Sequence, residues 1–212
     1  NSELFIAAGS TCLFEKAWYL RGFDNFLTDL AAEPEFANKL LDAILEYNLA
    51  FIGEFIKQGV DAVFFGDDYA HQHGMLMRPA TWREYFKPRL ARMFRQVRQA
   101  GLPVFLHCCG DMTAILDDLV EIGLNVLQPC QPESLDLAAL KKRYRNKLCF
   151  WGGIGTQRTL PFGTPDQVKQ EVRERIRTLG ESGGYIIGTG HSVQKDVPVE
   201  NILALIEAVR RQ

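Results

Sequence analysis

A histidine and a cysteine stand two residues apart where an apolar segment of the chain ends. His107 and Cys109 follow Val104-Phe105-Leu106. Because side chains alternate between the two faces of an extended strand, this spacing places both on the same face. Imidazole nitrogen and cysteine thiolate are preferred zinc ligands, and a catalytic zinc takes three protein ligands and leaves one position open. We therefore expect His107 and Cys109 to act as a unit that suits zinc, with Cys108 between them buried as a small apolar side chain.

Other polar residues follow apolar segments elsewhere and could complete such a site. Asp67 and Asp68 come directly after the run Ala62–Gly66, and His191 follows the last apolar run. Two neighbouring carboxylates raise the pKa of one of them and can divide acid and base roles. We predict catalytic roles for Asp67, Asp68 and His191. The third metal ligand is open between His191, Cys130 and one of the two acids.

A third group of residues has the character of a ligand-binding surface. In Trp151-Gly152-Gly153, a large aromatic side chain stands beside backbone without side chains, which suits a flat ligand but also suits packing. Gln128 and Gln131 are further polar residues at the end of an apolar run. We predict that these five residues bind substrate. His71 and His73 lie in a polar loop and are expected to hold no metal.

Elements that position these residues follow from hydrophobic periodicity. Short, nearly continuous apolar runs alternate with amphipathic segments, as in parallel strands that are covered on both faces. The predicted strands are Leu4–Ala8, Ala62–Phe65, Val104–His107, Val126–Gln128, Leu148–Trp151 and Tyr185–Ile187. The predicted helices are Glu35–Lys57, Thr81–Ala100, Thr113–Ile122, Gln167–Leu179 and Pro198–Arg211.

The distribution of polar residues favours a barrel over an open, doubly wound sheet. Five successive predicted strands end in a polar or glycine cluster, whereas an open sheet gathers its ligand site at one switch point. We therefore predict an α/β fold of the (β/α)₈ TIM-barrel type. Six strands fall short of eight, so about two N-terminal βα units are expected to be missing or to be supplied by another chain. Residues 1–212 are expected to form a single domain.

Composition excludes several classes of protein. The 212 residues are 47% hydrophobic and 24% charged, and the formal net charge is -2. Acidic and basic residues are interspersed, which argues against binding to nucleic acid or to an anionic membrane. The five cysteines are an odd number and two are adjacent, so reduced thiols are expected rather than a disulfide framework. No apolar run is long enough to span a bilayer, and a soluble, cytoplasmic protein is expected.

The order of these clusters resembles the uroporphyrinogen decarboxylase superfamily. The resemblance rests on an acidic strand end, then His107-Cys108-Cys109-Gly110, then Trp151-Gly152-Gly153 and a terminal Gly190-His191. Supporting stretches are residues 82–89, 159–165 and 183–187. The resemblance covers nearly the whole chain. It implies a barrel enzyme whose reactive groups lie on the loops that follow the strands.

Within that superfamily, the resemblance implies one of two activities. Cobamide-dependent methyltransferases hold a zinc with His-x-Cys and a distant third cysteine, and here His191 stands in place of that cysteine. True uroporphyrinogen decarboxylases use no metal or cofactor, and they use a histidine that His191 resembles. Their arginines and aspartate come from an N-terminal part of the barrel that is outside this sequence. In a decarboxylase, Cys109 would have no role.

We therefore prefer a zinc-dependent methyltransferase acting between a methyl-corrinoid and a thiol, with His107, Cys109 and His191 as ligands. A decarboxylase that acts on a tetrapyrrole is the alternative. A noncatalytic barrel that binds a tetrapyrrole or corrinoid is a third hypothesis. The implied partners are a tetrapyrrole or corrinoid ligand and a corrinoid protein, and a homodimer is left open.

Overall fold

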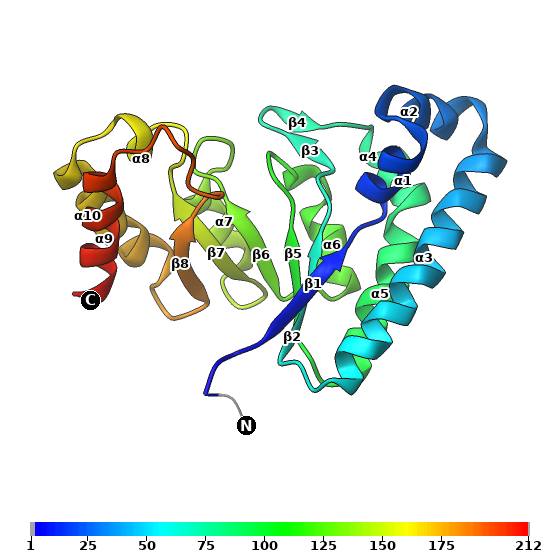
Figure 1. The fold of residues 1–212 in the computed structure, drawn as a ribbon, viewed down its shortest axis with the longest axis horizontal. Coiled ribbons are helices and arrows are strands. Elements are labelled where there is room, and N and C mark those ends of the chain that lie inside the picture. The colour runs from blue at the N-terminus through cyan, green and yellow to red at the C-terminus, as the bar shows by residue number, and fades with distance from the viewer. Residues whose placement is uncertain (1–2, 212) are drawn as a thin grey trace. The chain divides into compact units, whose positions relative to one another are not determined.

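Apolar runs of the sequence form parallel strands, and the amphipathic segments between them form helices (Figure 1). The computed structural model describes residues 3–211. The chain falls into two compact units, residues 1–125 and 126–212. Whether they form the predicted single domain stays a prediction.

The first unit is built on three parallel strands in the order β1-β2-β5. Its elements are β1 (Ala7–Thr11), α1 (Phe14–Arg21), α2 (Phe23–Ala32), α3 (Pro34–Lys57), β2 (Ala62–Gly66), β3 (Ala70–His71), β4 (Gly74–Met75), α4 (Pro79–Tyr85), α5 (Lys87–Gln99), β5 (Val104–His107), the 3₁₀ turn η1 (Thr113–Ile115) and α6 (Leu116–Ile122). Strands β3 and β4 form a short antiparallel hairpin.

Aromatic side chains fill much of the core of this unit. Phe65 of β2 packs on Phe94 of α5 with ring centroids 5.0 Å apart. Phe14 at the start of α1 meets the rings of Tyr69 and Phe86, and all three side chains are buried. Burial of such rings is the main favourable term for this packing. The core therefore ties α1 to the loop that follows β2.

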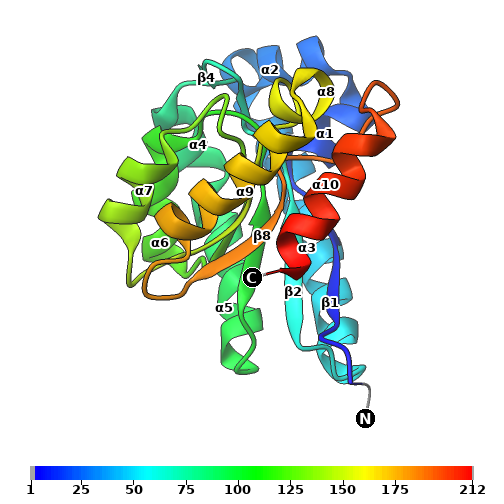
Figure 2. The ribbon, with the colours of Figure 1, turned by 90° about the vertical axis from the view of Figure 1, so that its left-hand side faces the viewer.

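Three more parallel strands, in the order β6-β7-β8, form the second unit. Its elements are β6 (Val126–Cys130), α7 (Leu137–Tyr144), β7 (Cys149–Ile154), α8 (Thr159–Phe162), α9 (Pro165–Leu179), β8 (Tyr185–Thr189) and α10 (Val199–Arg210). Helices α9 and α10 lie side by side (Figure 2), and Val168, Val172 and Ala204 belong to their shared core with Ile154. Thr164 caps α9 with a complete capping box.

The six predicted strands and five predicted helical regions are found, with changes at their ends. The first strand is Ala7–Thr11 rather than Leu4–Ala8, and Leu4 is exposed. The predicted helix Thr81–Ala100 is divided at Phe86, because Pro88 lacks an N–H group and its ring obstructs a continuous helix. Residues 113–115 form a 3₁₀ turn, so the predicted helix Thr113–Ile122 begins at Leu116.

Several helices and strands of the structure were not predicted from the sequence. They are α1, α2, α7, α8 and the β3-β4 hairpin. Helix α1 has almost no amphipathic pattern, and α8 and the two hairpin strands are too short for periodicity to detect. All five cysteines are free. Among residues 3–211, no helix combines the length and apolar character needed to cross a membrane.

Candidate active site

The register between β2 and β5 brings two of the predicted clusters together. Gly66 pairs with His107, and the backbone N–H of Asp67 donates to the His107 carbonyl at 3.0 Å. The residues that follow the two strands therefore leave the sheet side by side. This pairing places Asp67 and Asp68 next to the His107-Cys108-Cys109 segment.

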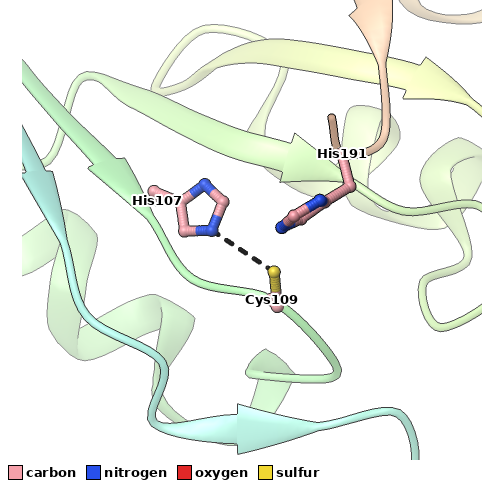
Figure 3. A group of neighbouring side chains, drawn as sticks. All are labelled: His107, Cys109 and His191. Carbon is pink, nitrogen blue, oxygen red and sulfur yellow. Dashed lines mark hydrogen bonds between the residues drawn. The ribbon is translucent and has the colours of Figure 1, made fainter. Parts of the chain in front are cut away.

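The side chains of His107 and Cys109 meet, as their spacing predicts. Nε2 of His107 lies 3.3 Å from Sγ of Cys109 (Figure 3). Both side chains are partly buried. Cys108 points elsewhere: it is 1% exposed, and its sulfur accepts a hydrogen bond from the Tyr69 N–H at 3.3 Å. The structure thus separates one structural thiol from one that is available to a metal or substrate.

Gly110 closes the turn directly after this pair. Its φ is +83°, and a Cβ at this position would lie 2.3 Å from the carbonyl oxygen of His71. The next residue, Asp111, donates its N–H to that same carbonyl at 2.9 Å. Only a residue without a side chain allows the β5 loop to approach the hairpin this closely. His71 is accordingly part of the support for the loop.

Asp68 faces the His107 and Cys109 pair. Its Oδ1 accepts the backbone N–H of Cys109 at 2.7 Å and lies 3.7 Å from Nε2 of His107. Burial, followed by the charges of Asp68 and Glu15, raises the pKa of the Cys109 thiol to about 12. A cation bound here would favour the thiolate and offset this repulsion.

Asp67 has a different environment from Asp68, although both were predicted to be catalytic. It is 2% exposed. Its carboxylate accepts four hydrogen bonds, from the N–H groups of Leu13 (2.7 Å), Phe14 (2.9 Å) and Glu15 (2.8 Å) and from the Tyr69 hydroxyl (2.6 Å). Burial raises the pKa of Asp67 to about 6, although these hydrogen bonds act in the opposite direction. A catalytic role for Asp67 stays a prediction.

Two titratable residues beside the start of α1 were missed by the sequence prediction. Glu15 is in the first turn of α1, and burial, together with Asp67 and Asp68, raises its pKa to about 7. Cys12 precedes the same helix, and burial followed by the charge of Asp67 raises its thiol pKa to about 11. Neither residue belongs to a motif. The one feature of the sequence that could have indicated them is their position after the first predicted strand.

In the second unit, Gly152 and Gly153 are required by packing. Their φ values are +118° and +93°, and a Cβ on Gly152 would lie 2.9 Å from the backbone nitrogen of Cys130. The Gly152 carbonyl accepts the Tyr185 hydroxyl at 2.8 Å, and the Gly153 carbonyl accepts Nε of Arg175 at 2.9 Å. The positive φ values and the close approach of neighbouring atoms explain why glycine stands at both positions, and the predicted role of both residues in substrate binding stays a prediction.

The remaining predicted residues lie within strands of the second unit or directly after them. Trp151 and Gln128 are partly buried within β7 and β6. Gln131 is 6% exposed and follows β6. His191 is exposed and follows β8. Their roles toward substrate or metal stay predictions.

His71 and His73 lie in the β3-β4 hairpin. Nδ1 of His71 accepts the backbone N–H of His73 at 3.2 Å, and the ring centroids are 6.1 Å apart. This hydrogen bond occupies one of the two nitrogen atoms with which His71 could bind a metal. The geometry is that of a local turn.

Known proteins similar to this chain carry two activities. The model of the uroporphyrinogen decarboxylase (URO-D) family matches residues 1–212. A uroporphyrinogen decarboxylase of Chlorobaculum tepidum is 25% identical over 185 residues, which cover 85% of this chain and 50% of that protein. A methylated-thiol–coenzyme M methyltransferase of Methanosarcina mazei is 25% identical over 200 residues, which cover 94% of this chain and 51% of that protein.

A solved structure shows the fold. A methyltransferase from Methanosarcina mazei superposes with a TM-score of 0.79 at 21% identity, covering 100% of this chain and 60% of that one. This match confirms the predicted α/β fold of the (β/α)₈ TIM-barrel type. The chain spans about half the length of the curated relatives it matches.

Proposed function

This chain belongs to the uroporphyrinogen decarboxylase family, and from that premise we propose that it acts as a zinc-dependent methyltransferase between a methyl-corrinoid and a thiol. The observation that carries the proposal is the contact of 3.3 Å between Nε2 of His107 and Sγ of Cys109. Nitrogen and sulfur donors at this spacing suit zinc. A decarboxylase that needs no metal gives the Cys109 thiol no task.

His191 is proposed as the third zinc ligand. This assignment requires the imidazole of His191 to complete the ligand set that His107 and Cys109 begin. Three protein ligands leave one position for a substrate, as in catalytic zinc sites. The donor set fits the ion, because imidazole and thiolate are both competent ligands. Zinc would supply a positive charge that favours the thiolate of a bound thiol at neutral pH.

The protein's own groups have defined tasks in this proposal. His107, Cys109 and His191 hold the ion, and Asp68 fixes the Cys109 backbone through its N–H group. Trp151, Gln128 and Gln131 are proposed to contact the corrinoid or the thiol. In the reaction, a sulfur–carbon bond forms and a cobalt–carbon bond breaks. The electron pair of that bond stays on the cobalt, and the proton of the thiol leaves to solvent. A cytoplasmic setting with a separate corrinoid protein is part of the proposal.

Decarboxylation of a tetrapyrrole is the second candidate, and the similarity to the Chlorobaculum tepidum enzyme favours it. Here Asp68 would stabilise a protonated pyrrole. His191 would bond a substrate carboxylate or a proton donor. Neither task needs zinc. The two candidates therefore differ in their response to metal removal.

Paired assays separate these candidates. The purified protein is incubated with methylcobalamin and 2-mercaptoethanol, and separately with uroporphyrinogen, before and after dialysis against a zinc chelator. We expect methylation of the thiol that is lost on dialysis and restored by zinc. Decarboxylation that is insensitive to the chelator, without thiol methylation, would replace the proposal with the second candidate. Binding of either tetrapyrrole without turnover would indicate a noncatalytic barrel.

A further inference from the structure

We propose that Arg175 and Glu171 of α9 are positioning residues that hold the loop carrying His191. This inference rests on the proposed zinc site, in which His191 is the third ligand, and it extends that site to a pair of charged side chains next to β7. All the contacts that carry it lie within residues 126–212. Neither Arg175 nor Glu171 contacts zinc or substrate in this proposal.

Arg175 and Glu171 form an ion pair that also binds the backbone at the end of β7. Nη2 of Arg175 lies 3.1 Å from Oε1 of Glu171, and the two residues stand about one helical turn apart. Nε of Arg175 donates to the carbonyl of Gly153 at 2.9 Å. Oε2 of Glu171 accepts the N–H of Gly155 at 3.2 Å. The ion pair therefore binds the backbone on both sides of Ile154.

Both members of this ion pair are largely shielded from solvent. The Glu171 side chain is 11% exposed, and that of Arg175 is 23% exposed. Hydrogen bonds that involve a charged group are stronger than those between neutral groups, and partial exclusion of water strengthens the attraction between charges. Loss of Arg175 would leave the Glu171 carboxylate buried without its countercharge. We therefore expect the two backbone contacts to restrain the end of β7.

Ile154 connects the ion pair to the loop that follows β8. Its carbonyl accepts the N–H of Gly190 at 2.8 Å, which extends the pairing of β7 with β8 by one residue beyond Thr189. Its side chain is fully buried in the core that it shares with Val168 of α9. His191 is the next residue after Gly190. The backbone of His191 is therefore placed by Ile154, and α9 restrains Ile154 through its side chain and through both of its neighbours.

The backbone at Gly190 lies close to two other segments. A Cβ at this position would lie 3.2 Å from the carbonyl oxygen of Ile154 and 3.6 Å from Cγ of Gln131. Closely packed atoms transmit a displacement to their neighbours, because no free space absorbs it. A shift at the end of β7 is therefore expected to move His191 as well.

Zinc affinity, measured by competition with a chromogenic chelator, tests this inference without any assay of turnover. Arg175→Met removes both contacts of the guanidinium group and is expected to weaken zinc binding about tenfold, the scale for groups that orient a metal ligand. In the His191→Ala background, Arg175→Met should cause no further loss, because non-additivity marks residues that act through one group. Arg173→Met replaces an exposed arginine of the same helix and is the matched control, which should keep wild-type affinity.

The outcomes separate this inference from the proposed function. A wild-type protein that binds no zinc would overturn both. Wild-type zinc affinity in a folded Arg175→Met variant, or an equal loss with and without His191, would overturn the inference alone.

A second variant covers the case in which Arg175→Met does not fold. Arg175→Lys keeps the charge, but a single amine does not reproduce the two contacts of the guanidinium fork. It should weaken zinc binding about threefold when His191 is present, the scale of coupling through a chain of contacts, and should have no effect in the His191→Ala background. Unchanged affinity in both backgrounds would overturn the inference.

Discussion

Cys108 and Cys109 are neighbours in sequence with opposite environments. Cys108 is 1% exposed and accepts a backbone hydrogen bond, whereas Cys109 meets His107 and is partly exposed. Both residues follow β5, which ends at His107, so their environments separate at the start of the loop. The same substitution at the two positions therefore distinguishes a structural thiol from a ligand.

We expect Cys109→Ser to weaken zinc binding by at least about 10²-fold, because serine replaces a thiolate ligand with a hydroxyl that stays protonated at neutral pH. Cys108→Ser should keep wild-type zinc affinity and lower the free energy of unfolding by about 1–3 kcal/mol, since it buries a hydroxyl in place of a sulfur. Chelator competition and urea unfolding measure the two quantities. Equal zinc loss in both variants would contradict the assignment.

At the scale of single residues, sequence predicts what depends on local spacing. A period of two predicted that His107 and Cys109 share a face, and their side chains do meet although β5 already ends at His107. The environment of Asp67 could not be predicted, because three of its four donors lie 52 to 54 residues away. The roles of Gly152 and Gly153 depend on Tyr185 and Arg175, which lie outside any local pattern.

At the scale of elements, the loop after β5 depends on its approach to the β3-β4 hairpin. Gly110 has a positive φ and no room for a Cβ, whereas Gly59 has a φ of +74° and no atom within 4 Å of the point that a Cβ would occupy. A substitution at Gly59 would therefore meet only backbone strain, whereas a substitution at Gly110 would also meet a steric clash. The predicted helix Glu35–Lys57 ends just before Gly59, whereas the close contact of Gly110 depends on the β3-β4 hairpin, which periodicity does not reveal.

Gly59→Ala is expected to lower the free energy of unfolding by about 1 kcal/mol, the cost of a left-handed conformation for a residue with a Cβ. Gly110→Ala should cost about 3 kcal/mol or more, because the His71 carbonyl must also move. Zinc affinity should fall only in Gly110→Ala, which displaces the neighbouring Cys109. Urea unfolding of both variants checks the order, and equal costs would show that the hairpin yields without penalty.

At the scale of the whole molecule, the proposed ligand set takes residues from two distant parts of the sequence. His107 and Cys109 come from residues 1–125, and His191 comes from residues 126–212. The polar ends of successive strands predicted this combination, because the carboxyl ends of barrel strands share one face. Sequence could not choose between zinc and a metal-free site, since His191 suits both activities of the family.

His191→Ala should lower turnover by about 10²-fold or more, the scale of an acid–base or electrostatic group at a reacting centre. Stability should change little, because the residue is exposed. The variant should also lose zinc more readily than the wild type. If the folded variant keeps wild-type turnover, the loop after β8 is not part of the active site.

Zinc K-edge X-ray absorption of the purified protein tests the central claim most directly. The proposed ligands predict one sulfur at about 2.3 Å and two imidazole nitrogens at about 2.0–2.1 Å, with one further light atom at the open position. Cys109→Ser should remove the sulfur contribution from any zinc that remains bound. A protein without zinc, or a zinc shell made of oxygen and nitrogen alone, would contradict the assignment of His107 and Cys109 as a metal site.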